Sequence, residues 1–311
     1  MKAIVINEYG SKEKLKEQEV PTPQIKDNQV LVEVYATSIN PIDWKLREGY
    51  LRQMLDFSFP IILGWDVAGV ITEVGRNVTK FKVGDEVFAR PDTTANGTYA
   101  EYTAVDEDLL AKKPTNISYE QAASIPLAGL TAWQCLVDEV KLKHGEHVLI
   151  HAGAGGVGSL AIQFAKHIGA HVATTASEKN EIYVKELGAD QFINYRTQQF
   201  EEELEKVDAV VDTMGGEILD KSFQVLKPGG RIVTIAGQPK QELATQHQVK
   251  ATSYWLTPNG QQLSQIGELL EKGIVKPQVG HVFNFSENEL REAHKLSETH
   301  HAKGKIVIKM K

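Results

Sequence analysis

Three glycines with the spacing Gly-x-Gly-x-x-Gly carry the clearest chemical signal in the sequence. They are Gly153, Gly155 and Gly158. Glycine at the first position permits backbone angles that a side chain forbids. Glycine at the second lets a pyrophosphate touch the backbone, and glycine at the third lets a helix lie close to the preceding strand. The spacing therefore predicts a turn that binds a dinucleotide.

The segments on either side of this turn support the prediction. Residues 147–151 (HVLIH) are short and mostly branched and apolar, as expected for a buried parallel strand. Gly156 and Val157 complete the turn and begin a helix whose apolar residues recur at helical spacing as far as Gly169. The first amides of such a helix, and its dipole, point at a bound phosphate.

The residues after the second strand indicate which dinucleotide binds. NAD-binding folds carry a carboxylate about 20 residues after the glycines, which accepts hydrogen bonds from the ribose 2′-hydroxyl. Here the strand 171–177 ends at Ser177, and Glu178 and Lys179 follow in the turn. A hydroxyl and an ammonium suit a 2′-phosphate, so we expect NADPH rather than NADH. The alternative is that Ser177 caps a helix at 178–188 and Lys179 is solvated.

Composition bounds the class of protein. A chain of 311 residues is long enough for two domains. A net charge of −7 with scattered lysines and arginines argues against a nucleic-acid partner. No apolar run is long enough for a membrane span, and residues 1–6 are typical of a strand rather than a signal peptide, so we expect a cytoplasmic protein. The single cysteine, Cys135, is expected in the core.

The predicted elements change character along the chain. The first part is β-rich, and from about Ser118 strands alternate with helices, which predicts a doubly wound parallel sheet in an α/β protein. The strands expected besides those above are 30–35, 69–75, 208–212 and 231–236, with a turn at 227–230 and a helix around 119–139.

The tail departs from this alternation. A helix closed by Gly273 and another over 286–300 precede a solitary strand at 305–309. Because a single strand needs a partner sheet, we expect the tail to return to the β-rich part. The predicted domains are therefore 1–119, completed by 259–311, and 120–258.

Short motifs in a fixed order extend over nearly the whole chain. They are 40–49 (NPIDWKLREG), 60–64 (PIILG), 66–69 (DVAG), 83–87 (VGDEV), 97–102 (GTYAEY), 126–133 (PLAGLTAW) and 304–308 (GKIVI). With the glycine turn they resemble the medium-chain dehydrogenase/reductase superfamily, and within it the zinc-independent NADPH:quinone oxidoreductases and enone (2-alkenal) reductases. The resemblance implies a GroES-like catalytic domain, a Rossmann cofactor domain, an active site between them, and a homodimer.

The residues at the zinc-ligand positions differ from those of the zinc-binding members of that superfamily, and this limits the reactions that we expect. Zinc alcohol dehydrogenases carry cysteine at the position of Asn40, Gly-His-Glu at 64–66, and cysteine at the position of Leu127. Trp65 and Leu127 offer no zinc ligand, and the four-cysteine structural zinc loop is absent too, so we expect no zinc. Trp65 is expected either as a wall of the substrate pocket or in the core.

Chemistry without a metal favours an electrophilic small-molecule substrate. Alcohol oxidation needs a Lewis acid for the alkoxide, whereas reduction of a quinone or an activated C=C places charge on a carbonyl oxygen that hydrogen-bond donors can stabilise. We expect Lys45 to be that donor, helped by Asn40 and Tyr50; enone-reducing relatives carry a lysine at the position of Lys45. The alternative is a solvated Lys45. Asp43 either caps a helical turn or belongs to the site.

The resemblance also implies cofactor contacts. Thr131 is expected near the nicotinamide, and Tyr195, assisted by Arg196, at the adenosine 2′-phosphate. The alternatives are a Thr131 hydroxyl bonded within its own helix and a surface Tyr195. Strand ends, where ligands collect in this fold, add 212–214, Ala236 and Gly237. Two functions remain open: a reductase, and a catalytically silent NADPH-binding protein with a structural or sensing role.

Overall fold

The computed structural model describes residues 1–311, which divide into two compact units. The first unit comprises Met1–Leu130 and Pro258–Lys311, and the second comprises Thr131–Thr257. The sequence placed the first boundary at 119/120, eleven residues earlier. The difference arises because the helix at Tyr119–Ala123 packs on strands of the first unit.

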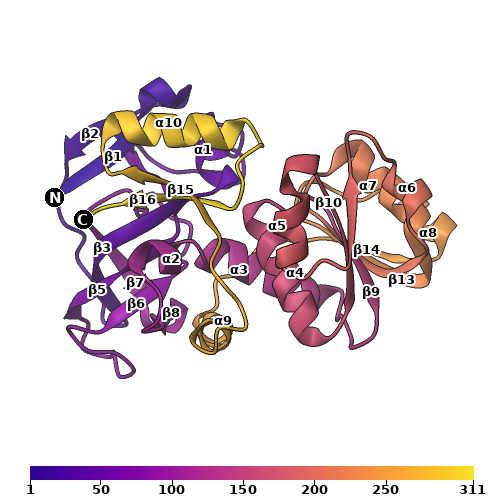
Figure 1. The fold of residues 1–311 in the computed structure, drawn as a ribbon. Coiled ribbons are helices and arrows are strands. Elements are labelled where there is room, and N and C mark those ends of the chain that lie inside the picture. The colour runs from indigo at the N-terminus through magenta and orange to yellow at the C-terminus, as the bar shows by residue number, and fades with distance from the viewer. The chain divides into compact units, whose positions relative to one another are not determined.

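The first unit is built mainly from strands (Figure 1). Its strands are β1 (Lys2–Ile6), β2 (Lys16–Glu19), β3 (Gln29–Ile39), β4 (Ile61–Ile62), β5 (Val67–Val74), β6 (Glu86–Ala89), β7 (Tyr102–Asp106), β8 (Leu110–Lys112), β15 (Val279–Asn284) and β16 (Lys305–Lys309). Its helices are α1 (Pro41–Arg47), α2 (Tyr119–Ala123), α9 (Gly260–Glu271) and α10 (Glu287–Glu298); α3 (Pro126–Trp133) crosses the boundary.

Two sheets form this unit, and the tail completes the larger one. Seven strands run in the order β15-β16-β3-β5-β6-β8, with β7 also paired to β3, while β2-β1-β4 make a small sheet. β16 lies antiparallel to β3, with Ile306 opposite Ile39 (Figure 1). The predicted return of the tail to the β-rich part is therefore confirmed.

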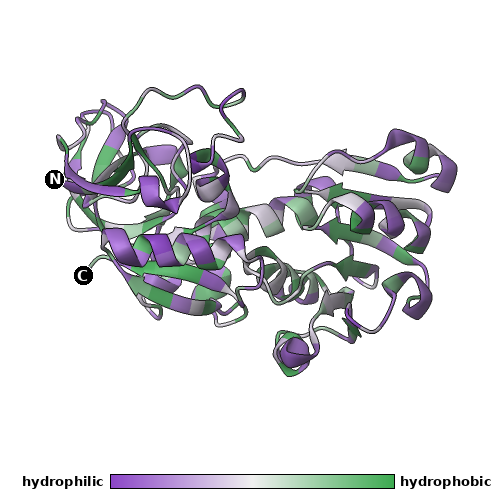
Figure 2. Cartoon of the chain, turned by 90° about the horizontal axis from the view of Figure 1, so that it is seen from above, coloured by the Kyte–Doolittle hydropathy of each residue, from purple (hydrophilic) through white to green (hydrophobic).

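The second unit is a doubly wound α/β structure. Its strands are β9 (His147–Ile150), β10 (His171–Ala176), β11 (Gln191–Asn194), β12 (Val207–Asp212), β13 (Leu226–Thr234) and β14 (Lys250–Ser253). Its helices are α4 (Gly156–Ile168), α5 (Glu181–Glu186), α6 (Phe200–Glu203), α7 (Gly216–Ser222) and α8 (Gln241–His247). In Figure 2 the strands of this sheet are mostly hydrophobic and its helices carry hydrophilic residues.

All neighbouring strands of this sheet are parallel, in the order β11-β10-β9-β12-β13-β14. Counted from the first strand of the unit, that order is 3-2-1-4-5-6, the dinucleotide-binding arrangement, in which ligands bind where the order reverses beside strand 1. The predicted fold class is confirmed. The glycine turn directly follows β9, which is strand 1.

Three predicted elements differ from the structure. Residues 227–230, predicted as a turn, lie inside β13, where the ladder to β12 shifts register and Gly229 adopts φ +80°. The helix expected around 119–139 is divided into α2, α3 and a π-helical segment at Gln134–Glu139. The helix expected at 178–188 begins as a 3-10 turn and is α-helical only over Glu181–Glu186.

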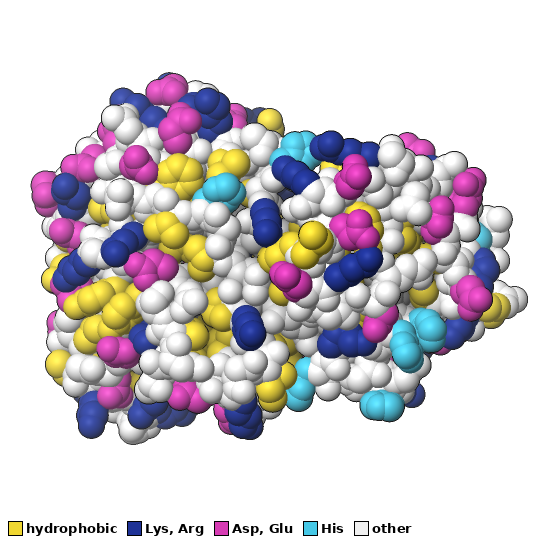
Figure 3. Space-filling view, in the orientation of Figure 1, with side chains coloured by type: hydrophobic (Ala, Val, Ile, Leu, Met, Phe, Trp, Pro, Cys, Tyr) yellow, Lys and Arg dark blue, Asp and Glu magenta, His cyan; other side chains and the backbone are white.

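The burial of the single cysteine agrees with the expectation from the sequence. Cys135 is fully buried, and burial raises the pKa of its thiol to about 12. Acidic and basic side chains are interspersed on the face drawn in Figure 3, so that face presents no basic stripe. None of the helices combines the length and the apolar character that a membrane crossing requires.

Candidate active site and cofactor site

Two glycines of the turn are needed for close packing, and the third faces open space. A Cβ on Gly153 would lie 2.1 Å from Thr174 Oγ1, and one on Gly158 would lie 2.3 Å from the carbonyl oxygen of Ala152. A Cβ on Gly155 would meet only that carbonyl oxygen, at 3.3 Å. The space in front of the backbone at Gly155 is therefore open, and a pyrophosphate that binds against the backbone needs this space.

The backbone strain of the turn lies at a different residue from the one expected. Ala152 adopts φ +52°, whereas Gly153 does not have a positive φ. The interpretation that Gly153 supplies unusual backbone angles is wrong: Gly153 is needed because Thr174 packs against it. Gly155 is the N-cap of α4, which begins at Gly156 and Val157. The amides of the first turn of this helix have no partner within the helix, and they follow directly after the open position at Gly155.

The residues expected at the adenosine 2′-phosphate lie at neighbouring strand ends. Ala176 and Asn194 are register partners in β10 and β11, and Tyr195 N donates to Ala176 O at 3.3 Å. Ser177 therefore lies beside Tyr195, whose side chain is 48% exposed. The guanidinium carbon of Arg196 is 5.9 Å from the Tyr195 ring.

The hydroxyl of Ser177 does not cap the helix that follows. Its Oγ accepts a hydrogen bond from Asn180 Nδ2 at 3.2 Å and forms no bond to a backbone amide of the next turn. Lys179 is exposed in the same 3-10 turn. The structure thus brings Ser177, Tyr195 and Arg196 together, with Lys179 in the adjoining turn.

A buried carboxylate that sequence reasoning treated only as a strand end organises the ends of β12 and β13. Asp212 is fully buried and accepts hydrogen bonds from Met214 N at 3.0 Å and from Thr234 Oγ1 at 2.6 Å. Thr234 Oγ1 also accepts from Ala236 N at 3.1 Å. Gly237 follows with φ +146° and no atom within 4 Å of an added Cβ. Asp212 therefore fixes the backbone of Ala236 and Gly237.

His151 packs at a strand end, as expected. Its Nε2 is 2.9 Å from Ser222 Oγ and its Nδ1 is 3.2 Å from Thr175 Oγ1. Burial lowers the pKa of His151 from 6.5 to about 4, so the imidazole is neutral at physiological pH.

This lowered pKa gives a pH prediction. The unfolded chain binds a proton at His151 below pH 6.5 and the folded chain does not, so stability is lost as the pH falls. Between pH 6.5 and pH 5, we expect the free energy of unfolding of the wild type to fall by about 2 kcal/mol more than that of His151→Gln, since one pKa unit is about 1.4 kcal/mol. Urea unfolding at both pH values measures this. Equal pH dependence of the two proteins would show that His151 is not held neutral.

In the first unit, α1 carries the expected donor. Lys45 is half-buried, and its Nζ is 5.7 Å from the centroid of the Trp44 ring. Tyr50 is 70% exposed, its N donates to Lys45 O at 3.0 Å, and its ring meets Trp44 edge-on at 6.2 Å. Lys45 and Tyr50 thus flank Trp44. Thr131, in the last turn of α3 within the second unit, is buried.

Asn40, expected beside Lys45, is turned toward a buried carboxylate instead. It is 2% exposed, and its Nδ2 donates to Asp66 Oδ2 at 2.7 Å. Asp66 Oδ2 also accepts from Ser38 Oγ at 2.6 Å, and Asp66 Oδ1 accepts from Leu127 N at 2.7 Å. Lys305 Nζ donates to Asn40 Oδ1 and lies 3.4 Å from Asp66 Oδ2. We call these five residues the Asp66 network; Asp66 and Lys305 were not expected as site residues.

The residues at the zinc-ligand positions do not fit a zinc ion. Both carboxylate oxygens of Asp66 and both amide atoms of Asn40 are committed within the Asp66 network. Leu127 contributes only its backbone N–H. Trp65 is fully buried in the apolar core, which settles the open choice between pocket wall and core. No group of three or more His, Cys, Asp or Glu side chains is arranged to hold a metal ion.

Asp43 caps α1 and ends a buried hydrogen-bond chain. Its Oδ2 accepts from Asn40 N at 2.8 Å and from Tyr99 Oη at 2.7 Å. Arg47 can only donate hydrogen bonds, so His294 Nδ1 accepts one from it at 3.1 Å. The hydrogen of the His294 ring is therefore on Nε2, which donates to Tyr99 Oη at 3.2 Å. Burial raises the pKa of Asp43 to about 7. Asp43 Oδ1 has no hydrogen-bond partner.

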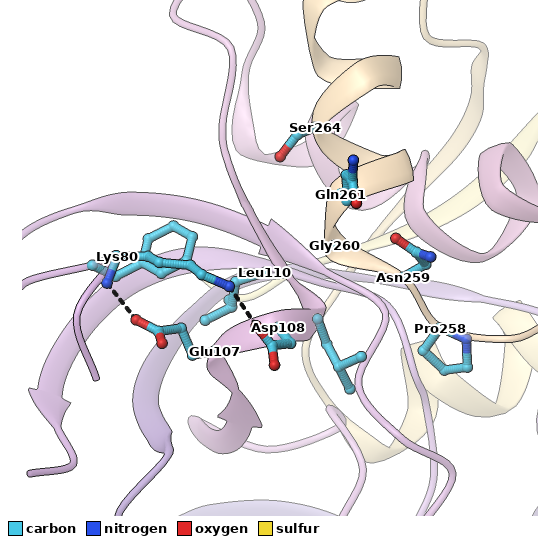
Figure 4. Close-up of a pocket in the computed structure, with 11 residues that line it drawn as sticks. Lys80, Glu107, Asp108, Leu110, Pro258, Asn259, Gly260, Gln261 and Ser264 are labelled. Carbon is cyan, nitrogen blue, oxygen red and sulfur yellow. Dashed lines mark hydrogen bonds and ion pairs between the residues drawn. The ribbon is translucent and has the colours of Figure 1, made fainter. Parts of the chain in front are cut away.

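A hollow elsewhere on the first unit contains none of the expected site residues. Figure 4 shows it between the start of α9, with Asn259 and Gly260, and the 3-10 turn that carries Glu107 and Asp108. The charged groups there satisfy each other, because Lys80 pairs with Asp108 through its ammonium and with Glu107 through its backbone N–H. This hollow therefore contributes nothing to the candidate site.

Comparison with known proteins places the chain in a family. Residues 26–115 match the alcohol dehydrogenase GroES-like domain, and residues 187–308 match a domain family described as zinc-binding dehydrogenase. The chain is 40% identical to the chloroplastic NADPH-dependent alkenal/one oxidoreductase of Arabidopsis thaliana, over 99% of this chain and 79% of that protein. It is 34% identical to the chloroplast envelope quinone oxidoreductase homolog of the same plant, over 99% and 98%.

A solved structure agrees with these relatives. The quinone oxidoreductase from Coxiella burnetii superposes with a TM-score of 0.94 at 38% identity, covering 100% of this chain and 99% of that one. Sequence, domain composition and fold thus lead to one assignment. The chain belongs to the medium-chain dehydrogenase/reductase superfamily, as do the alkenal/one and quinone oxidoreductases that it resembles.

Proposed function

We propose that this protein is a zinc-independent, NADPH-dependent reductase that transfers a hydride to a quinone or an α,β-unsaturated carbonyl. The observation that carries the proposal is the open position at Gly155 in front of the first turn of α4, beside strand 1 of the parallel sheet. The likeness to an alkenal/one oxidoreductase and a quinone oxidoreductase supports the choice of substrate class.

The chain's own residues hold the cofactor at several positions. With NADPH bound, the turn at 153–158 would contact the pyrophosphate. Ser177, Lys179, Tyr195 and Arg196 would hold the 2′-phosphate, and Thr131, Ala236 and Gly237 would hold the nicotinamide half. A hydroxyl, an ammonium and a guanidinium favour a phosphate dianion over a bare ribose. NADPH, when bound, supplies the hydride.

Lys45 stabilises the charge that reaches the substrate oxygen. Its ammonium donates a hydrogen bond to the carbonyl oxygen as negative charge develops there, and the exposed hydroxyl of Tyr50 assists. A proton from water then neutralises the enolate or the hydroquinone anion. Asn40 acts on this step indirectly, because its amide is occupied within the Asp66 network.

Cofactor preference tests the assignment of the 2′-phosphate residues. We expect kcat/KM to be higher with NADPH than with NADH, and Arg196→Ala to lower the value for NADPH by roughly 10- to 100-fold, since a hydrogen bond to a charged group is worth about 1.5–3 kcal/mol. The value for NADH should stay unchanged, which is the internal control. A wild-type preference for NADH would refute the assignment.

Zinc independence is a separate prediction. The donor groups at the zinc-ligand positions are consumed by the Asp66 network, so we expect purified protein to hold well under one zinc per chain and to keep its turnover after treatment with a chelator. Elemental analysis paired with activity measures this. One zinc per chain whose removal abolishes turnover would contradict it.

Three further properties that we expect from the sequence stay predictions. These are the homodimer, the cytoplasmic location, and the exact reaction class within NADPH-dependent quinone or enone reduction. Steady oxidation of NADPH with an acceptor separates the reductase from a catalytically silent NADPH-binding protein, because both bind the cofactor.

A further inference from the structure

Lys305 holds a buried positive charge at the base of α1. Its side chain is 6% exposed, and its ammonium donates to Ile39 O at 3.0 Å and to Asn40 Oδ1, with Asp66 Oδ2 at 3.4 Å. The three acceptors match the three N–H groups of an ammonium. A charge buried in this way is tolerated only when it is paired and hydrogen-bonded, and the fully buried Asp66 supplies the pairing charge.

The pair binds the residue that precedes a very short helix. Asn40 immediately precedes α1, which has seven residues, and Lys45 lies in its last turn. Lys305 holds the amide oxygen of Asn40 and Asp66 holds the amide nitrogen. Because Asn40 and Lys45 are joined by the backbone of one short helix, a displacement at Asn40 also shifts Lys45.

We propose that Lys305 and Asp66 are positioning residues for Lys45, and that their internal ion pair fixes the start of α1. The inference rests on the proposed function, in which Lys45 is the donor to the substrate oxygen. Neither residue touches the reacting atoms. Each acts through Asn40 and the orientation of α1.

Variants of the pair test this inference. We expect Lys305→Met and Asp66→Asn each to lower kcat on the order of 10²-fold, since displacing a catalytic group by about 1 Å costs that much. Each should also lower Tm, because the remaining partner is left buried and unpaired. The dissociation constant for NADPH should stay within about twofold of the wild-type value, because the glycine turn belongs to the second unit.

A matched control comes from a second buried lysine of the same unit. Lys113 Nζ donates to Pro114 O at 3.1 Å and Ile117 O at 2.9 Å and pairs with Glu86 at 3.1 Å, but it does not contact α1. We expect Lys113→Met to lower Tm and leave kcat near the wild-type value. The double variant Asp66→Asn with Lys305→Met removes both members of this ion pair, so it should regain part of the Tm that each single variant loses while kcat stays low.

A readout independent of turnover separates this inference from the proposed function. The Nζ of Lys45 lies near the Trp44 ring, so the ¹³C resonance of reductively methylated Lys45, assigned with Lys45→Met, reports its position. We expect it to shift in both single variants and in the double variant but not in Lys113→Met. An unmoved resonance, or a double variant that regains both Tm and kcat, overturns the inference. A wild type that oxidises no NADPH with any acceptor overturns the proposed function alone.

Discussion

Replacing Lys45 by Met lowers kcat by about 10²- to 10³-fold and leaves NADPH affinity close to that of the wild type. The methionine keeps the length of the side chain and its packing beside Trp44 but removes the ammonium. Loss of one donor that stabilises a developing oxyanion costs about 2.7–4 kcal/mol in comparable sites. The lost hydrogen bond stabilises the transition state, so the substitution lowers kcat and does not weaken cofactor binding.

Steady-state kinetics together with an NADPH titration measure this effect. Lys295→Met, which removes an exposed lysine from α10, is the matched control and should change neither quantity. Tyr50→Phe should give a smaller loss than Lys45→Met, because a neutral hydroxyl stabilises charge less than an ammonium. If Lys45→Met turns over at the wild-type rate, Lys45 is a solvated lysine and the mechanism needs another donor.

A pair of glycine substitutions has the second large effect and separates binding from folding. The backbone at Gly155, with φ −81° and ψ 177°, suits any residue, and an added Cβ meets only Ala152 O at 3.3 Å. We expect Gly155→Val to fold with a modest loss of stability and to bind NADPH roughly 10- to 100-fold more weakly, because the side chain keeps the pyrophosphate from the backbone amides and a charge-assisted bond is worth about 1.5–3 kcal/mol.

Gly158→Ala should behave in the opposite way. Its Cβ would lie 2.3 Å from a backbone carbonyl oxygen, which cannot rotate aside as a side chain can. We expect it to destabilise the second unit by about 1–3 kcal/mol or more. Thermal unfolding and an NADPH titration on both variants give the comparison. A Gly155→Val protein with unchanged affinity would show that the pyrophosphate lies elsewhere.

The parts of the fold that depend on local pattern could be predicted from the sequence. The glycine turn, the strand before it and the helix closed by Gly169 follow from spacing and periodicity over a few residues. The return of the final strand follows because a single strand needs a partner sheet. The positive φ at Ala152 could not be predicted, because residues other than glycine rarely adopt it. Alanine at such a position gives no signal in the sequence.

The Asp66 network could not be predicted, because its members are far apart in the chain. The donors to Asp66 lie 26, 28, 61 and 239 residues away, at Asn40, Ser38, Leu127 and Lys305. No local pattern records such a set. One signal was present in retrospect: Asp66 and Lys305 are each a charged residue at the edge of an apolar strand segment. The sequence therefore indicated Asn40 as a site residue without indicating what holds it.

The central claim is hydride transfer from NADPH to an electrophilic carbon without a metal. It is tested most directly by giving chelator-treated protein an α,β-unsaturated aldehyde and NADPH deuterated at the transferable C4 position, then analysing the product by mass spectrometry and NMR. The account predicts one deuterium per NADPH oxidised, on the carbon β to the carbonyl, with no zinc in the sample. Absence of NADPH oxidation with every enal and quinone offered, or oxidation that returns only when zinc is added, would contradict it.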